Sequence, residues 1–318
     1  MKPARARIEA VSGLRPVVVT YASAFIFLAT VLAASQVSPV FLSPNNLGNV
    51  LSQVTITGII GLGMTLVILT GGIDLSVGAV VALVSVLMTG TQQYGFFPSV
   101  TIALAVGATV GWLNGVGVVY GRMQPFIMTL GMMTVARGVA FVYSGGAPMA
   151  VELEALNVLG GSHFVGVPIP GLIFVVLLVA AGIFMARFPA GRHIYAIGSN
   201  PDAARLAGVS VPRHLIGVYT FSGVMAAVGG IVFVAQQGVG MAVAGVGYEL
   251  NAIAAVVLGG ASLFGGEGTV YGTALGAAIL GVLGNMMNLS GVNPFAQDLL
   301  KGIIIISVVL IRRVIGGR

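Results

Sequence analysis

Residues 64–83 read MTLVILTGGIDLSVGAVVAL. Two apolar runs flank the break TGGID at 70–74, and Asp74 is the only charged residue of the stretch. A helix needs about 20 predominantly apolar residues to cross a bilayer. We therefore expect two membrane spans here, separated by a break short enough to lie within the membrane. Transporters place functional backbone at such interrupted spans.

The composition of the whole chain indicates a membrane protein. Of its 318 residues, 57% are hydrophobic and 7% are charged, and the mean hydropathy is +1.06. A soluble domain is typically about 25% charged, so a water-soluble fold would leave too much apolar surface uncovered. The 48 glycines suit closely packed transmembrane helices. The lack of cysteine excludes disulfides and thiolate metal sites.

Apolar segments predict an all-α polytopic membrane protein with about ten transmembrane helices. Residues 1–318 are expected to form a single transmembrane domain. The expected spans are 17–35, 48–70, 75–91, 98–120, 125–144, 169–187, 215–236, 248–264, 269–289 and 296–312. A second short break, FGGEG at 264–268, could also lie within the membrane.

Two rows of glycines at spacing four predict close helix packing. The rows belong to the fourth and ninth expected spans and consist of Gly107, Gly111 and Gly115, and of Gly268, Gly272 and Gly276. Because the rows fall in opposite halves of the chain, they suggest that the first five and last five spans form inverted repeats.

The basic residues predict the orientation of the chain. With ten spans, twelve of the 14 lysines and arginines fall on one face: Lys2, Arg5, Arg7, Arg15, Arg122, Arg187, Arg192, Arg205, Arg213, Arg312, Arg313 and Arg318. Such residues concentrate in cytoplasmic loops, so we expect both termini in the cytoplasm, with 1–16 as a cytoplasmic tail. This location also argues against nucleic acid as the partner of a chain with net charge +6. The apolar run after the tail is long for a cleaved signal peptide.

The longest expected cytoplasmic loop, 188–214, contains a well-specified short helix. Ser199 or Asn200 can cap its start, and Pro201 suits the first helical position. A short helix with a small apolar side is suited to docking into a groove on a soluble partner. That side would consist of Ala203, Leu206 and Ala207.

Several segments resemble the permease subunits of sugar-uptake ABC transporters of the ribose/xylose/arabinose group. The match runs in order from about residue 45 to the end. It is carried by MTLVILTGGIDLSVGAVVAL (64–83), GWLNGVGVVYGRMQPFIMTLGMMTVARG (111–138), GRHIYAIGSNPDAARLAGVSV (191–211), GYELNAIAAVVLGGASLFGGEGTVYGTALGAAILGVL (247–283) and VNPFAQDLLKGIIII (292–306). Gln124 and Asn251 depart from the group's pattern, which often has a proline and usually an aspartate at these positions.

The resemblance implies the type II ABC importer permease fold and a set of partners. These are an ABC ATPase subunit that binds ATP and Mg²⁺, a periplasmic sugar-binding protein, and a second permease copy, identical or paralogous, in the inner (plasma) membrane lipid. The element at 199–208 resembles the coupling helix that docks on the ATPase. The expected coupling residues are Arg192, Ser199, Asn200, Asp202, Arg205 and Leu206, and Glu152 and Glu154 are candidates for docking the binding protein.

Polar residues inside the expected spans are candidates for the substrate path, because ionisable groups are costly in a bilayer and asparagine can both donate to and accept from a polyol. The candidates are Asp74, Asn114, Arg137, Glu249 and Asn251. Each has an alternative structural role, such as capping a helix or hydrogen bonding between helices. Asp298 and Lys301 lie three residues apart and are expected to pair on one helix face.

The sequence contains no phosphate-binding loop, metal-ligand pattern or catalytic triad spacing. We therefore expect a transport subunit without a cofactor or catalytic residues of its own, importing a monosaccharide or related polyol with energy from ATP hydrolysis on another chain. The alternative is an ion-coupled secondary transporter of small polar solutes. It would need mid-membrane carboxylates, of which the chain has few.

Overall fold

The computed structural model describes residues 23–316, with side chains through residue 304 and at 306. The expected tail 1–16 lies outside the described residues. The helices after Ser23–Val37 are α2 Pro44–Leu69, α3 Val77–Gly90, η1 Gln92–Tyr94, α4 Phe96–Val119, α5 Pro125–Ser144, α6 Glu154–Gly161, α7 Ile169–Arg187, α8 Pro189–Ser199, α9 Pro201–Leu206, α10 Val211–Gln237, α11 Tyr248–Leu258, α12 Val270–Leu289 and α13 Pro294–Gly316. The prediction of a mostly helical polytopic protein is confirmed.

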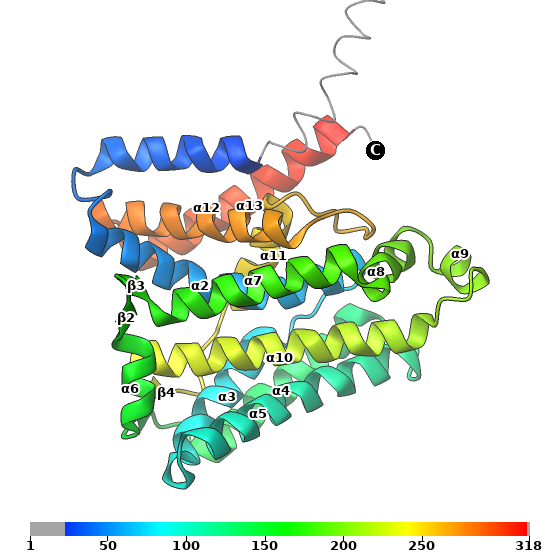
Figure 1. Cartoon of the computed structure of the whole chain (residues 1–318), viewed down its shortest axis with the longest axis horizontal. Coiled ribbons are helices and arrows are strands. Elements are labelled where there is room, and N and C mark those ends of the chain that lie inside the picture. The colour runs from blue at the N-terminus through cyan, green and yellow to red at the C-terminus, as the bar shows by residue number, and fades with distance from the viewer. Residues whose placement is uncertain (1–22, 317–318) are drawn as a thin grey trace, which may run out of the picture.

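Short strands lie at one end of the helix bundle. Strand β1 (Met149–Ala150) pairs antiparallel with β4 (Val239–Gly240), and β2 (His163–Phe164) pairs with β3 (Val167–Pro168). We call this the β1 end. The opposite end carries α8 and α9 and is called the α9 end (Figure 1).

Local sequence sets the helix ends. Ser43 accepts a hydrogen bond from the Asn46 backbone N–H at the start of α2, and Thr269 accepts one from the Gly272 N–H at the start of α12. Gly145 and Gly238 end α5 and α10 in the left-handed conformation that glycine adopts without strain.

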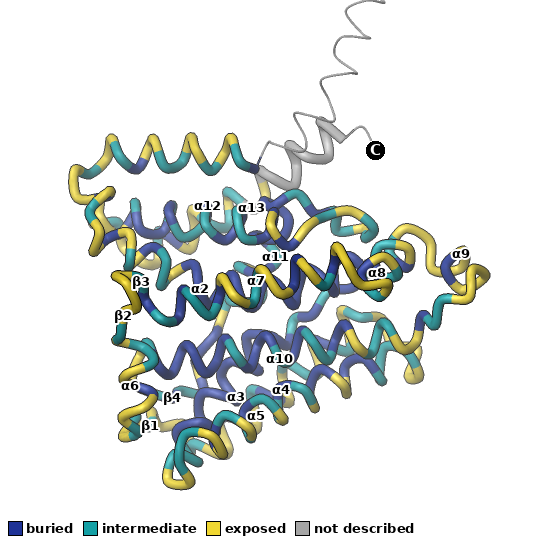
Figure 2. Tube along the Cα trace, viewed as in Figure 1, coloured by how far each residue is buried: buried dark blue, intermediate teal, exposed yellow. Residues whose placement is uncertain are grey.

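Helices α2 and α10 form the centre of the bundle. They pack against each other, α4 packs on α10, and α12 packs on α2. Figure 2 shows α10 largely buried along its length, while α5 and α7 expose their outer faces. This reciprocal pairing is what an inverted repeat would produce.

In the described part of the chain, six helices are long and apolar enough to cross a membrane alone, namely α2, α4, α5, α7, α10 and α12. Ser23–Val37, α3 and α11 are shorter apolar helices. The expected tenth span coincides with α13. The count of about ten spans thus stays a prediction, whereas a multi-pass membrane protein is supported.

Two segments differ from the expected boundaries. The eighth span was expected to reach residue 264, but α11 ends at Leu258 because Gly259 lies against the Gly272 backbone and Gly260 has φ 107°. The stretch 188–214 is largely helical and contains α8 as well as the expected short helix. Helix α8 buries Gly191, Ile194 and Ile197.

Candidate functional site

The break at 70–76 runs from the α9 end into the interior of the bundle. Its start is at the α9 end, where the Gly266 N–H donates to the Leu69 carbonyl over 2.9 Å. The Thr129 hydroxyl then donates to the Ile73 carbonyl over 3.2 Å. From this interior position α3 continues to the β1 end. Along this course the Ser85 hydroxyl of α3 donates to the Met241 carbonyl over 3.0 Å and accepts from the Met241 N–H over 3.1 Å.

A second broken span runs in the opposite sense. After β4, the chain from 241 to 247 follows α3 inward from the β1 end, and α11 then continues toward the α9 end. The starts of α3 and α11 meet in the interior, since a Cβ added to Gly78 would collide with the Glu249 carboxylate and the Gly245 carbonyl. Only glycine fits at this contact. Two half-helices that start in the middle of the bundle are the arrangement in which transporters place binding sites.

Asp74 is fully buried at the start of α3 and has three hydrogen-bond donors. Its Oδ1 accepts from the Ser76 backbone N–H (3.0 Å) and Oγ (2.6 Å), and its Oδ2 accepts from Ser222 Oγ of α10 (2.8 Å). Asn114 of α4 donates to Ser76 Oγ over 2.9 Å. The helix N-terminus adds favourable electrostatics for an acidic group. Asp74 and Asn114 therefore connect α3, α4 and α10.

Arg137 of α5 holds the segment 241–247, which forms turns, in place. Its guanidinium donates to the Ala242 carbonyl (2.8 Å) and the Ala244 carbonyl (2.5 Å). Glu249, in the first turn of α11, lies close enough to attract this positive charge, and its Oε1 accepts from the Gly247 N–H over 3.2 Å. Arg137 thus has a structural role here, since it binds backbone carbonyls of another segment.

The five candidate path residues fall into two groups. Asp74 and Asn114 are fully buried in the bundle, whereas Arg137, Glu249 and Asn251 are half-buried. The second group lies beside the non-helical segment 241–247, on which Val243 and Val246 are exposed. We call this surface of α5, 241–247 and the start of α11 the α5 face.

Three buried polar atoms lack a hydrogen-bond partner among the described residues. They are Asn114 Oδ1, Tyr219 OH and Glu249 Oε2. Tyr219, on α10, has its hydroxyl near Gly72 and Asp74. The sequence interpretation missed Tyr219, Ser76 and Ser222, because a single hydroxyl in an apolar helix carries no spacing pattern.

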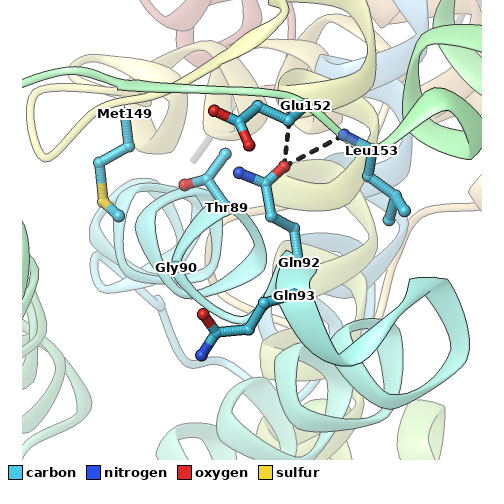
Figure 3. Close-up of a pocket in the computed structure, with 7 residues that line it drawn as sticks. All are labelled: Thr89, Gly90, Gln92, Gln93, Met149, Glu152 and Leu153. Atoms are coloured by element: carbon cyan, nitrogen blue, oxygen red, sulfur yellow. Dashed lines mark hydrogen bonds between the residues drawn. The ribbon is translucent and has the colours of Figure 1, made fainter.

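At the β1 end a pocket of about 310 Å³ lies between the end of α3 and the chain at 149–153 (Figure 3). Gln92 holds the two together. Its Oε1 accepts from the backbone N–H groups of Glu152 (2.8 Å) and Leu153 (3.2 Å), and its Nε2 donates to the Ala150 carbonyl (3.1 Å). The Glu152 side chain is exposed above this pocket, and Glu154 is exposed at the start of α6.

At the α9 end, the short helix forms as expected. Asn200, not Ser199, is its cap and accepts from the Asp202 and Ala203 N–H groups at 3.1 and 2.9 Å. Ser199 ends α8 and donates to the Tyr195 carbonyl. Arg205 forms an exposed ion pair of 3.0 Å with Asp202.

Helix α9 is fixed on one side and free on the other. Ala204 is buried with Ile197 and Val211, while Leu206 is 91% exposed. Arg192 is exposed on α8. Phe264, in the neighbouring loop, is 93% exposed and was missed by the sequence interpretation. Exposed large apolar groups outside the apolar spans are typical of an interaction surface.

Tyr195 connects α8 to the loop that carries Phe264. Its hydroxyl donates to the Gly268 carbonyl over 2.8 Å. Burial raises the pKa of Tyr195, so the hydroxyl keeps the proton that this bond requires. This bond links α8 to the segment that precedes α12.

Comparisons with known proteins identify the family of the chain. The family model described as "Branched-chain amino acid transport system / permease component" matches residues 46–309. The chain is 43% identical over 287 residues to a ribose import permease of Bacillus subtilis (strain 168), covering 89% of each chain. It is 40% identical over 282 residues to a fructose import permease of Rhizobium meliloti, covering 85% of this chain and 78% of that one.

A third relative is the D-allose transport system permease of Escherichia coli (strain K12), 33% identical over 300 residues that cover 93% of this chain and 92% of that one. No solved structure matches the chain. Because the family model covers most of the chain and each of these relatives is aligned along most of its own length, the chain belongs to the family of membrane permease components of ABC import systems.

Proposed function

We propose that the chain imports a monosaccharide or related polyol across the inner membrane, driven by ATP that is hydrolysed with Mg²⁺ on a separate ATPase subunit. The similarity to ribose, fructose and D-allose permeases along most of the chain supports this substrate class. A periplasmic sugar-binding protein delivers the substrate. The whole chain acts as one transmembrane permease domain with the type II importer fold.

The α9 end faces the cytoplasm. Its described segments carry Arg122, Arg187, Arg192, Arg205 and Arg213, and the connecting loops at the β1 end contain no lysine or arginine. This asymmetry is the pattern of cytoplasmic loops. The N- and C-termini then also lie in the cytoplasm, and the β1 end with Glu152 and Glu154 faces the binding protein.

The α5 face lines the passage together with a second permease copy. The observation that carries this assignment is the exposure of Val243 and Val246 on the non-helical segment 241–247. Irregular backbone at membrane depth does not occur against lipid and is tolerated only against protein or a water-filled cavity. Arg137, Glu249 and Asn251 would present polar groups to a passing sugar, whereas Asp74 and Asn114 hold the broken span in place.

ATP-driven motion enters the bundle through α9. The exposed Leu206 docks in a groove of the ATPase, Arg192, Asp202 and Arg205 surround it, and Ser199 and Asn200 shape the turn that carries it. The bond from Tyr195 to Gly268 then couples α8 to α12.

Reconstitution tests the proposed function. Proteoliposomes with this chain, its ATPase and its binding protein should take up labelled sugar only when ATP is supplied. Uptake by this chain alone, driven by a sodium or proton gradient, would overturn the proposal.

The docking role of α9 is tested by Leu206→Asp. We expect the variant to insert normally but to lose co-purification with the ATPase. The matched control is Phe164→Asp, which changes an exposed apolar residue (66%) at the β1 end. Equal loss in both variants, or normal association of Leu206→Asp, would contradict the assignment.

A further inference from the structure

A groove with a volume of about 540 Å³ lies between α7 and α10 near the α9 end. Its walls are almost entirely apolar and include Leu177 and Phe184 of α7, Ile194 of α8 and Phe221 of α10. This volume is in the range of ligand pockets. None of the residues proposed for the substrate path or for ATPase coupling lines it.

The groove exists because α7 and α10 both pack on α2. Leu66 of α2 forms its floor, and α8 lies at its end (Figure 1). Small residues keep it open. Ala180 and Ala181 line it from α7, and Gly217 lines it from α10, where an added Cβ would meet nothing within 4 Å. The backbone on both sides is helical, so the groove can face lipid without exposing unpaired backbone groups.

The polar end of the groove is basic. Arg213 and His214 line it there. His214 Nδ1 lies 2.8 Å from the Ser210 carbonyl, and His193 Nδ1 lies 3.1 Å from His214 Nε2. One neutral tautomer satisfies both contacts: each Nδ1–H donates, and His214 Nε2 accepts. The imidazoles are then engaged with the protein, and Arg213 remains as the cation at the opening.

The charged side chains around this opening of the groove are all basic. Arg187 at the end of α7 and Arg192 on α8 are exposed on the segments next to Arg213. The ion pairs found in the described residues are Arg205 with Asp202 and Lys301 with Asp298, so these three arginines have no carboxylate within 4 Å there. No acidic residue lines the groove. The site thus combines an apolar channel between helices with an unneutralised positive end.

We infer that this groove binds an anionic phospholipid, with an acyl chain between α7 and α10 and the headgroup phosphate at Arg213. Basic pockets between transmembrane helices on the cytoplasmic side hold anionic headgroups, and arginine binds phosphate with two parallel hydrogen bonds. A sugar is excluded because the walls offer it few hydrogen-bond partners. The choice of the cytoplasmic leaflet rests on the orientation proposed above, but the lipid chemistry does not.

The test uses the purified full-length chain in nanodiscs of phosphatidylcholine, to which phosphatidylglycerol is added in steps. The thermal unfolding midpoint should rise with phosphatidylglycerol because binding to the folded state stabilises it. Arg213→Gln should weaken the apparent affinity about fivefold, the usual effect of one basic residue near an anionic surface. Gly217→Leu should weaken it by filling the groove while leaving the midpoint in phosphatidylcholine unchanged.

Matched variants separate a built site from general attraction to a negative membrane. Arg122→Gln removes a basic residue at the same end, outside the groove, and Gly138→Leu adds the same side chain to an open glycine on α5. Both should leave the phosphatidylglycerol response intact.

Equal weakening in Arg122→Gln and Arg213→Gln, or an unchanged response in Gly217→Leu, would overturn the inference. So would equal stabilisation by soluble glycerol phosphate, which would show that no acyl chain is bound. The assay needs neither sugar nor ATPase, so its failure is distinct from failure of the proposed transport function.

Discussion

Asn46 and Asn285 exchange two amide hydrogen bonds of 2.9 Å each, although 239 residues separate them in sequence. Both side chains are buried between α2 and α12. Asn46 also donates to the Phe41 carbonyl over 2.9 Å. The pair fixes the register of α2 against α12 near the β1 end, in a region where apolar contacts alone would allow the helices to slide.

The contributions of Asn46 and Asn285 to the free energy of unfolding should depend on each other. Asn46→Leu leaves the Asn285 amide buried without its partner, so we expect a loss of about 1–2 kcal/mol in the free energy of unfolding. Asn285→Leu should cost a similar amount. The double variant should cost less than the sum, as measured by thermal unfolding in detergent. Strict additivity would show that the two amides do not support each other.

Asp74 should act mainly on stability. Asp74→Ala leaves the Ser76 and Ser222 hydroxyls without their acceptor, so we expect a loss of about 3 kcal/mol and a low yield in membranes. Asp74→Asn keeps one acceptor oxygen and should be milder. The measurement is folded yield and unfolding midpoint for both variants. A stable Asp74→Asn protein that assembles with its ATPase but transports no sugar would instead place Asp74 in the path.

The glycine row of α4 should tolerate no side chain. A Cβ on Gly111 would collide with the Tyr219 carbonyl of α10, and one on Gly115 with the Ile216 backbone. Gly111→Leu should therefore destabilise the fold by about 3 kcal/mol. Gly138→Leu, on α5 at a position where an added Cβ would meet nothing within 4 Å, should leave the unfolding midpoint near that of the unchanged chain. Similar midpoints for the two variants would contradict this packing.

Much of the fold followed from apolar periodicity and caps, because both are local. The α9 helix illustrates this: Asn200, one of the two expected caps, and Pro201 at the first helical position are adjacent in sequence, and the structure contains both. The glycine rows also predicted close packing, and the α4 row lies against α10. Their partners were not predictable. The second row begins just before α12, and its members lie against residues 255–261, at the end of α11 and just after it, rather than against a matching long helix.

The site was less predictable, since its parts meet only in three dimensions. Asp74 and Arg137 stood out as ionisable groups in apolar spans, but Ser222, which donates to Asp74, and the two carbonyls that Arg137 binds lie more than 100 residues away in sequence. Nothing in the sequence distinguishes Ser222 or Ala242 from their neighbours. The inward course of 241–247 was missed for the same reason, as its apolar residues suited a connecting loop equally well.

The cysteine-free chain allows the α5 face to be tested by single thiols. Val246 (70% exposed) lies on the non-helical segment 241–247, and Val176 (66% exposed) lies on the outer face of α7. If the α5 face lines a water-filled passage, a charged maleimide should label Val246→Cys in the assembled transporter, since thiolate forms only where water reaches the sulfur. Val176→Cys, surrounded by lipid, should stay unlabelled.

Adding Arg137→Gln should raise the labelling rate at Val246→Cys, because the segment loses the guanidinium that holds the Ala242 and Ala244 carbonyls. Equal labelling at both positions, or none at Val246→Cys in any nucleotide state, would remove the α5 face from the translocation path.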